Sequence, residues 1–257
     1  MQNAISSNKP LGHKCYGSIP HLPGSKLGPA DHMIEQKLAD IATGVITKHN
    51  KWPFMVVVQE KLDGSCVGVA RINDELIALT RRGYLASTSP FEMHHYFDKW
   101  VKINKKRFMD ILANGERACG EWLMQAHGTL YNLRHEPFVL FDILKEHERL
   151  SYSDLLKRLK ANMSTFVLPT IVHYDSIGLD IETVMKRIDF TSDRHGAIDP
   201  VEGAIWRIEN TKTNKIQFVT KYVRPCKEVG KYLDKTIWNI TPEKLFERSL
   251  ECHTMQN

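Results

Sequence analysis

The residue with the clearest chemical potential is a lysine at the end of an apolar run. Lys61 follows Val56-Val57-Val58-Gln59-Glu60 and directly precedes Leu62-Asp63-Gly64-Ser65. The run predicts a buried strand, and Asp63-Gly64 is typical of a tight turn that leaves it. Burial at the edge of a core lowers the pKa of a lysine, and a neutral amine is a nucleophile. The alternative is a lysine whose ammonium reaches from the strand end to water.

Charged residues also interrupt several later apolar segments. They are Glu121 in Gly120-Glu121-Trp122, Asp142 after Phe141, Glu202 before Gly203, and Lys221 within residues 218–223. Such charges are costly to bury unless they are paired or used. Each alone fits a salt bridge at a strand end. Together with Lys61 they favour one functional site built from the ends of several strands.

The elements that must position these residues form an α+β pattern. Further strands are predicted for residues 67–72, 75–80, 119–125, 138–143, 166–174, 203–208 and 216–223, with Asn73-Asp74 as a hairpin turn. Helices are predicted for residues 32–43, capped by Asp31, and for 91–113, 153–161 and 181–188, with short helical segments near 229–238 and 242–250. Strands and helices do not alternate strictly, so antiparallel sheets are expected.

The bulk composition is that of a soluble globular protein. The 257 residues are 42% hydrophobic and 25% charged, and the net charge of +5 permits a polyanionic partner without requiring one. Five widely spaced cysteines without a CxxC pattern indicate a reduced protein without a zinc site, and the twelve histidines are interpreted as surface or core residues. The polar N-terminus and the short apolar run at 53–58 predict a cytoplasmic protein that does not cross a membrane.

The ordered motifs resemble those of the covalent nucleotidyltransferases, the superfamily of ATP-dependent RNA and DNA ligases and mRNA capping enzymes. Lys61-Leu62-Asp63-Gly64 resembles the KxDG signature. The later elements occur in the family's order: Arg81-Arg82-Gly83, Gly120-Glu121-Trp122, residues 138–143, Glu202-Gly203 within residues 201–206, and Lys221. The resemblance covers about residues 13–225. Residues 16–22, 60–65 and 221–225 make the chain more similar to RNA ligases than to DNA ligases.

This resemblance implies a ligase adenylation domain with antiparallel sheets flanked by helices. It would span residues 1–225, including an N-terminal arm, and be followed by a short helical tail, residues 226–257, without an OB domain. The implied reaction has three phosphoryl transfers, in which a lysine takes AMP from ATP, AMP moves to a 5′-phosphate end, and a 3′-hydroxyl attacks that end. The implied cofactors are ATP and Mg²⁺ or Mn²⁺, the partner is nucleic acid with RNA preferred, and the process is RNA repair.

The resemblance also assigns residues to the phosphate chemistry. Lys61 would be the nucleophile, and Lys221 would stabilise charge on the α-phosphate. Glu202 would hold the metal ion, since Mg²⁺ takes few carboxylates. Arg81 would contact phosphate on the nucleotide or on the nucleic acid.

A second set would bind the nucleoside. Glu121 would accept hydrogen bonds from the ribose, Phe141 would stack on adenine, and Glu60 would line the adenine pocket. Asp63 belongs to the signature and would support the turn around Lys61.

Three departures from the family pattern leave alternatives open. Cys66 stands where related ligases often carry Asn or Arg, Val219 replaces the first lysine of the last motif, and only about 32 residues follow Pro225. The alternatives to an RNA ligase are an ATP-dependent DNA ligase, a GTP-dependent capping enzyme and an inactive nucleic-acid-binding relative. The basic run at 102–107 is interpreted as a solvated helix face.

Overall fold

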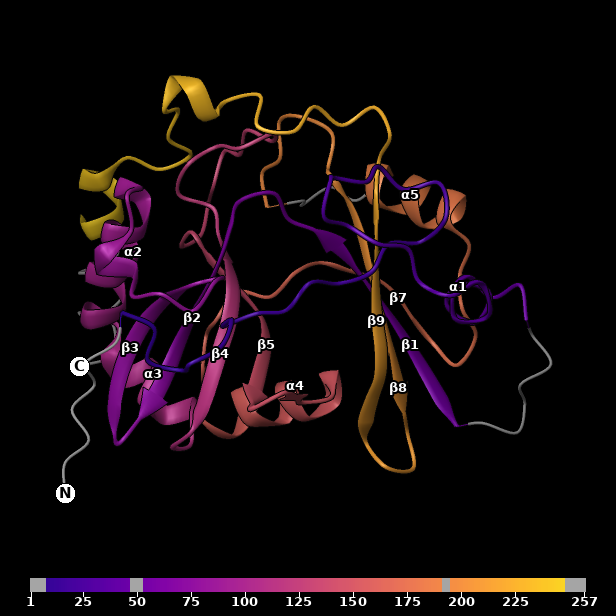
Figure 1. Cartoon of the computed structure of the whole chain (residues 1–257), viewed down its shortest axis with the longest axis horizontal. Coiled ribbons are helices and arrows are strands. Elements are labelled where there is room, and N and C mark those ends of the chain that lie inside the picture. The colour runs from indigo at the N-terminus through magenta and orange to yellow at the C-terminus, as the bar shows by residue number, and fades with distance from the viewer. Residues whose placement is uncertain (1–7, 47–52, 191–194, 248–257) are drawn as a thin grey trace.

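Two antiparallel β-sheets stand side by side in the computed structural model, which describes residues 8–46, 53–190 and 195–247 (Figure 1). The first sheet has the strand order β7-β1-β8-β9, and the second has the order β3-β2-β4-β5-β6. Every strand pair in both sheets is antiparallel. The predicted antiparallel α+β class is therefore confirmed.

The elements have the following bounds. The strands are β1 (Phe54–Lys61), β2 (Ser65–Ile72), β3 (Glu75–Thr80), β4 (Glu116–Trp122), β5 (Phe138–Lys145), β6 (Glu148–Arg149), β7 (Ile171–Asp175), β8 (Gly203–Asn210) and β9 (Lys215–Val223). The α-helices are α1 (Gln36–Thr43), α2 (Glu92–Ile103), α3 (Lys105–Ile111), α4 (Tyr152–Ala161) and α5 (Ile181–Phe190), and the 3-10 helices are η1 (Ala86–Thr88) and η2 (Leu233–Lys235).

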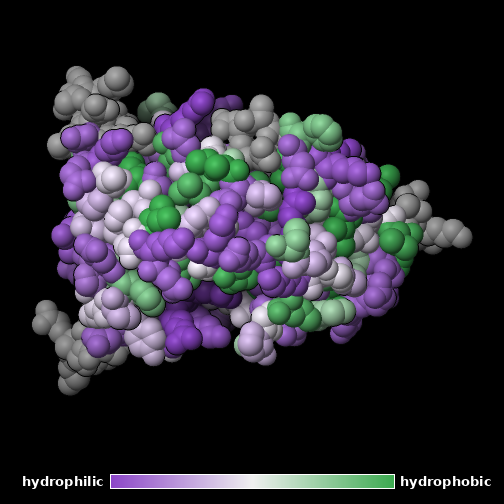
Figure 2. Space-filling view, turned by 90° about the horizontal axis from the view of Figure 1, so that it is seen from above, coloured by the Kyte–Doolittle hydropathy of each residue, from purple (hydrophilic) through white to green (hydrophobic). Residues whose placement is uncertain are grey.

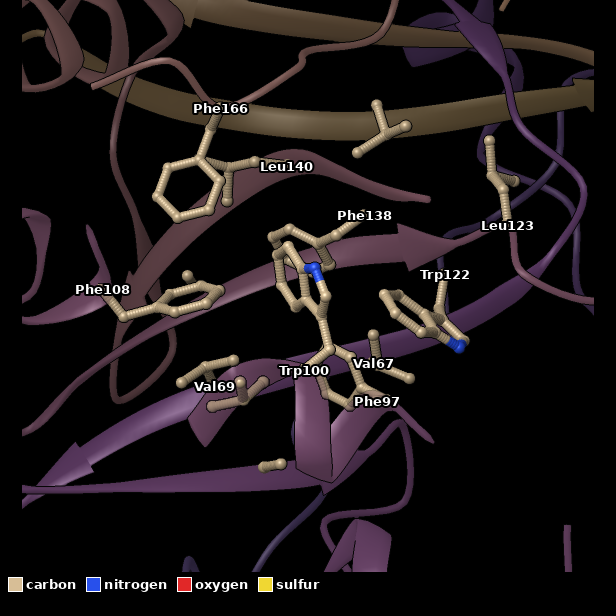
Figure 3. Packing of buried hydrophobic residues seen from close by; sticks show 14 of the residues in the cluster. Val67, Val69, Phe97, Trp100, Phe108, Trp122, Leu123, Phe138, Leu140 and Phe166 are labelled. Carbon is tan, nitrogen blue, oxygen red and sulfur yellow. The ribbon is translucent and has the colours of Figure 1, made fainter. Parts of the chain in front are cut away.

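The second sheet packs against α2 and α3 around a cluster of aromatic side chains. Trp100 lies at its centre, with ring centroids 5.5 Å from both Trp122 and Phe138 (Figure 3). Phe97 and Phe108 complete the cluster from the two helices, and all five side chains are buried. Burial of each such aromatic contributes on the order of 2–3 kcal/mol. The aromatic residues of the predicted helix at 91–113 therefore form a core, and they hold β4 and β5 in place.

The first sheet has its own apolar layer, formed with α1 and α5. Val56 and Val58 alternate along β1 and pack in one cluster with Trp206 of β8 and Val184 of α5. Because side chains alternate across a strand, Lys61 must point to the opposite face from these valines. The strand thus buries Val56 and Val58 on one side and presents Lys61 on the other.

Several predicted elements differ in their bounds. The helix predicted from residue 32 begins at Gln36, after Glu35, and Asp31 does not cap it. The helix predicted for 91–113 is divided at Asn104, whose side-chain amide donates to the Trp100 carbonyl at 2.9 Å. The strand predicted from 166 begins at Ile171. Around 229–238 only η2 is helical, residues 242–247 are helical, and 248–250 lie outside the described residues.

The segment after β9 crosses the top of the molecule and ends beside α2 (Figure 1). The Tyr232 amide donates to the His127 carbonyl and the Asn239 amide to the Met124 carbonyl, both at 2.8 Å. Ile240 and Leu245 are buried in the same core cluster as α2. We call residues 226–247 the crossing segment.

The surface seen from above carries hydrophobic residues as separate patches among hydrophilic ones (Figure 2). Within the described ranges, none of the helices combines the length and apolar character needed to span a membrane.

Candidate active site

A cavity of about 920 Å³ collects all eight residues predicted for the site. Both sheets contribute to its wall. The eight residues are Glu60, Lys61, Asp63, Arg81, Glu121, Phe141, Glu202 and Lys221. They extend from Glu60 to Lys221 in the sequence, and strand pairing brings them together: β1 with β8 and β8 with β9 in the first sheet, and β3 with β2, β2 with β4 and β4 with β5 in the second.

Lys61 forms an ion pair with Glu202 at the centre of this wall. Lys61 pairs with Gly203 in the sheet, which places Glu202 beside it, and the Lys61 Nζ donates to the Glu202 Oε2. The side chains are only 21% and 13% exposed. Burial alone would lower the pKa of Lys61, but the charges of Glu202 and Glu121 outweigh it, and the pKa is raised. The lowered pKa expected from the sequence is therefore wrong for this arrangement, because the sequence does not show the neighbouring carboxylates.

Glu121 has a strongly perturbed carboxyl group in the cavity. Burial raises its pKa to about 7, and Glu202 adds to this effect, while Lys61 and a hydrogen bond from the Gly64 amide at 3.1 Å oppose it. Burial also raises the pKa of Glu202. The site therefore holds two carboxyl groups with an elevated affinity for protons or for another cation.

The Glu121→Gln variant should remove part of the pH dependence of stability. The folded-state pKa of about 7 lies above the ordinary 4.5, so this group stabilises the fold below pH 4.5, and that contribution is lost as the pH rises through 7. Glutamine keeps the acceptor for Gly64 and cannot ionise. At pH 8 the variant should gain roughly 2–3 kcal/mol over wild type. Thermal unfolding from pH 4 to pH 8 measures the difference, and parallel stability profiles of the two proteins would contradict the assignment.

Lys221 is held near Lys61 by the N-terminal arm. Its Nζ lies 3.4 Å from Asp31 Oδ1, and Asp31 Oδ2 lies 3.2 Å from His21 Nε2. Burial lowers the pKa of Lys221, and the charge of Lys61 lowers it further, while Asp31 opposes both effects. Asp31 therefore places a cation in the cavity and is not the helix cap that the sequence predicted.

Asp63 fixes the turn after Lys61 to the loop that follows β4. Its Oδ2 accepts hydrogen bonds from the Gly128 amide at 3.1 Å and the Thr129 hydroxyl at 3.0 Å. The buried Lys227 of the crossing segment lies 3.5 Å from the same oxygen. These contacts support the structural role expected for Asp63.

The remaining predicted residues lie at the edges of the cavity. The Glu60 carboxylate accepts from the Thr170 amide at 2.9 Å and lies 2.7 Å from His195 Nε2, so its charge is engaged outside the Lys61 cluster. Phe141 packs edge-on against Tyr16, with ring centroids 5.0 Å apart. Arg81 is exposed, so its guanidinium is accessible to a ligand.

Sequence reasoning missed Arg207, which lines the cavity and connects the two sheets. Its guanidinium binds Asp142 of β5, and Asp142 also accepts from the Tyr16 hydroxyl at 2.6 Å. Arg207 lies opposite Val219 in the sheet, so a cation occupies the wall where the family pattern has its additional lysine. The signal was an arginine within the apolar segment 203–208.

The cavity residues could hold a divalent cation through only one or two protein ligands. Over residues 8–46, 53–190 and 195–247, no group of three or more His, Cys, Asp or Glu side chains is arranged to hold a metal. Glu202 offers hard carboxylate oxygens beside a second raised-pKa carboxyl, Glu121. This set suits Mg²⁺ or Mn²⁺, which can keep several waters and use one or two carboxylates.

Comparisons with known proteins identify relatives. The family model described as RNA ligase matches residues 55–223, which include every motif from Lys61 to Lys221. No curated protein matches.

Solved structures similar to this one include RNA ligases of Naegleria gruberi. One, with AMP and Mn, is 17% identical with a TM-score of 0.47, over 87% of this chain and 62% of that one. Another, with ATP and Mn, is 19% identical with a TM-score of 0.49, over 91% and 64%. A protein of Aquifex aeolicus described as an ATP-dependent DNA ligase is 16% identical with a TM-score of 0.46, over 81% and 49%. The chain thus spans less than two thirds of the length of these proteins.

Proposed function

This chain belongs to the RNA ligase family, which confirms the resemblance found in its motifs, and on that premise we propose that it is an ATP-dependent RNA ligase. In this proposal Lys61 takes AMP from ATP and pyrophosphate leaves, AMP passes to a 5′-phosphate end, and attack of a 3′-hydroxyl on that end forms the phosphodiester and releases AMP. The observation that carries the proposal is the convergence of Lys61, Glu121, Glu202 and Lys221 on one cavity.

Lys61 must lose its proton before it can attack the α-phosphate. At rest the ammonium is stabilised by Glu202, which raises its pKa. A divalent cation held through Glu202, directly or through water, would supply positive charge beside the phosphates and compete with Lys61 for the carboxylate. Lys221, whose own pKa is lowered, faces the same cavity and would stabilise the negative charge that develops on the phosphate.

The other residues would bind and orient the nucleotide. Glu121 would accept from the ribose hydroxyls, Phe141 would stack on adenine, and Glu60 would line the base pocket. Arg81, exposed at the rim, would contact phosphate. Asp63 would hold the turn so that Lys61 keeps its direction.

We further propose that residues 1–225 form the adenylyltransferase domain and that the chain acts in RNA repair. The contacts of Lys227 with Asp63, and of Ile240 and Leu245 with the core, tie the crossing segment closely to that domain.

A sealing assay tests the proposed reaction. The full chain is incubated with ATP, Mg²⁺ or Mn²⁺, and nicked duplexes whose 3′-hydroxyl strand is RNA or DNA. Formation of a phosphodiester at the RNA end, with release of AMP, is the expected result. Efficient sealing of DNA without any sealing of RNA would show a DNA ligase instead, and AMP transfer from neither substrate would contradict the ligase proposal.

A further inference from the structure

Two serines and two histidines line one part of the cavity and have no role in the chemistry above. They are Ser65, Ser89, His94 and His127. His94 is buried and lies between the two serines, with its Nε2 2.7 Å from the Ser65 Oγ and its Nδ1 2.6 Å from the Ser89 Oγ. This serine-histidine-serine chain starts four residues after Lys61, at the first residue of β2.

Both histidines are uncharged near neutral pH. Burial lowers the pKa of His94 to about 4, and the neighbouring His127 and His95 contribute to this effect. Burial also lowers the pKa of His127, while Asp63 opposes it. A neutral imidazole has one N–H donor and one acceptor nitrogen. His94 therefore donates to one serine and accepts from the other.

In either tautomer of His94, one of the two serine hydroxyl hydrogens is not used within this chain and is available for a ligand. If Ser89 donates to His94, the Ser65 O–H is available, and Ser89 then also accepts the Phe91 amide at 3.2 Å. If Ser65 donates instead, the Ser89 O–H is available. Both serines line the cavity, so either tautomer offers a donor there. His127 also lines the cavity, and its buried Nε2 has no hydrogen-bond partner among the described residues.

These groups favour a neutral ligand that both donates and accepts. A phosphate would be drawn to the cations of the same cavity, Arg81, Arg82 and Lys221. A ribose hydroxyl is a donor and an acceptor, and the 2′-hydroxyl distinguishes RNA from DNA. Two exposed aromatic side chains on the same cavity, Phe91 at 59% and Tyr84 at 45% exposure, offer faces on which bases can stack.

We infer that Ser65, His94, Ser89 and His127 form a subsite that reads a ribose hydroxyl of the nucleotides flanking the strand break. The inference rests on the proposed ligase function and names the determinant of its preference for RNA. Within it, His94 is a positioning residue that acts through the two serines, and the serines and His127 contact the substrate.

The test compares sealing of an RNA nick with sealing of the same nick carrying single 2′-deoxynucleotides on either side of the break. Wild type should prefer the ribose substrate. The double variant Ser65→Ala with Ser89→Ala should reduce the ratio of kcat/KM for the ribose nick to kcat/KM for the 2′-deoxy nick by about tenfold or more. Ser65→Thr keeps a hydroxyl and should retain the ratio. The matched control is Ser176→Ala, which removes an exposed serine outside the cavity.

Lysyl-AMP formation provides the second readout, measured with ATP and with 2′-deoxy-ATP. The ratio of these two rates should be equal in wild type and in the double alanine variant, because the subsite reads the strand. A change in this ratio would assign the hydroxyl to ATP and overturn the inference, as would a sealing ratio that stays within twofold of wild type. Should the double variant form no lysyl-AMP, the single Ser65→Ala and His94→Gln variants are scored by the same two ratios. Failure of wild type to form lysyl-AMP would instead overturn the proposed function.

Discussion

The Lys61→Ala variant should carry no AMP after incubation with ATP labelled at the α-phosphate. Of the two lysines that the structure describes in the cavity lining, Lys61 pairs with Glu202 and Lys221 is held by Asp31. Covalent labelling should therefore fall by at least about a thousandfold, to the limit of detection. The measurement is gel separation of the labelled protein after reaction with Mg²⁺ or Mn²⁺.

A second substitution separates loss of the nucleophile from loss of the fold. Lys61→Arg keeps a positive charge for Glu202, but a guanidinium does not deprotonate in proteins, so labelling should be lost equally. Lys102→Ala removes an exposed lysine of α2 and should label like wild type. Sealing of a strand that already carries AMP at its 5′ end should survive in Lys61→Arg, since that step does not need the amine. Labelling of either Lys61 variant at the wild-type level would refute the assignment.

The Asp142→Ala variant should lose about 3–5 kcal/mol of unfolding free energy. Asp142 is fully buried, and it binds Arg207, which is 2% exposed, and Arg149, whose Nε lies 3.3 Å away. Removing this carboxylate takes from two guanidinium groups the counter-ion that they share, and Arg207 is left with Glu209, whose Oε1 lies 3.4 Å from its Nε. The loss is measured as the change in urea unfolding midpoint at constant slope.

The expected cost comes from the uncompensated charge, so removing both partners should be milder. The double variant Asp142→Leu with Arg207→Met should be more stable than Asp142→Ala. Tyr16→Phe removes only the hydroxyl that donates to Asp142 and should cost about 1 kcal/mol. If Asp142→Ala unfolds at the wild-type urea concentration, the cluster does not hold the two sheets together as argued.

Local sequence chemistry was sufficient for the features that depend on near neighbours. Asn73 and Asp74 have φ angles of 51° and 62°, the left-handed values that a two-residue hairpin requires and that Asn and Asp tolerate well. The apolar run Val56-Val57-Val58 likewise predicted a buried strand that ends at Lys61, and β1 is that strand. The motifs also indicated the order in which the site residues occur along the chain.

Long-range partners account for what the sequence did not reveal. Asp31 looked like a helix cap because capping is local, but its partner Lys221 is 190 positions away. The raised pKa of Lys61 depends on Glu202, 141 positions away. The role of Arg207 depends on Asp142, and that of His94 on Ser65, and no periodicity connects either pair. Asn104 divides a helix that its apolar spacing predicts as continuous, and its side-chain amide donates to the Trp100 carbonyl, four residues earlier.

The crossing segment has a mechanical consequence for the cavity. It leaves the first sheet at β9, places Lys227 under the Asp63 turn, and binds the loop after β4 through Tyr232 and Asn239 before it reaches α2. Moving one sheet away from the other would expose the buried Lys227 ammonium and break these backbone hydrogen bonds. The crossing segment therefore restrains the two sheets from moving apart on this side of the cavity.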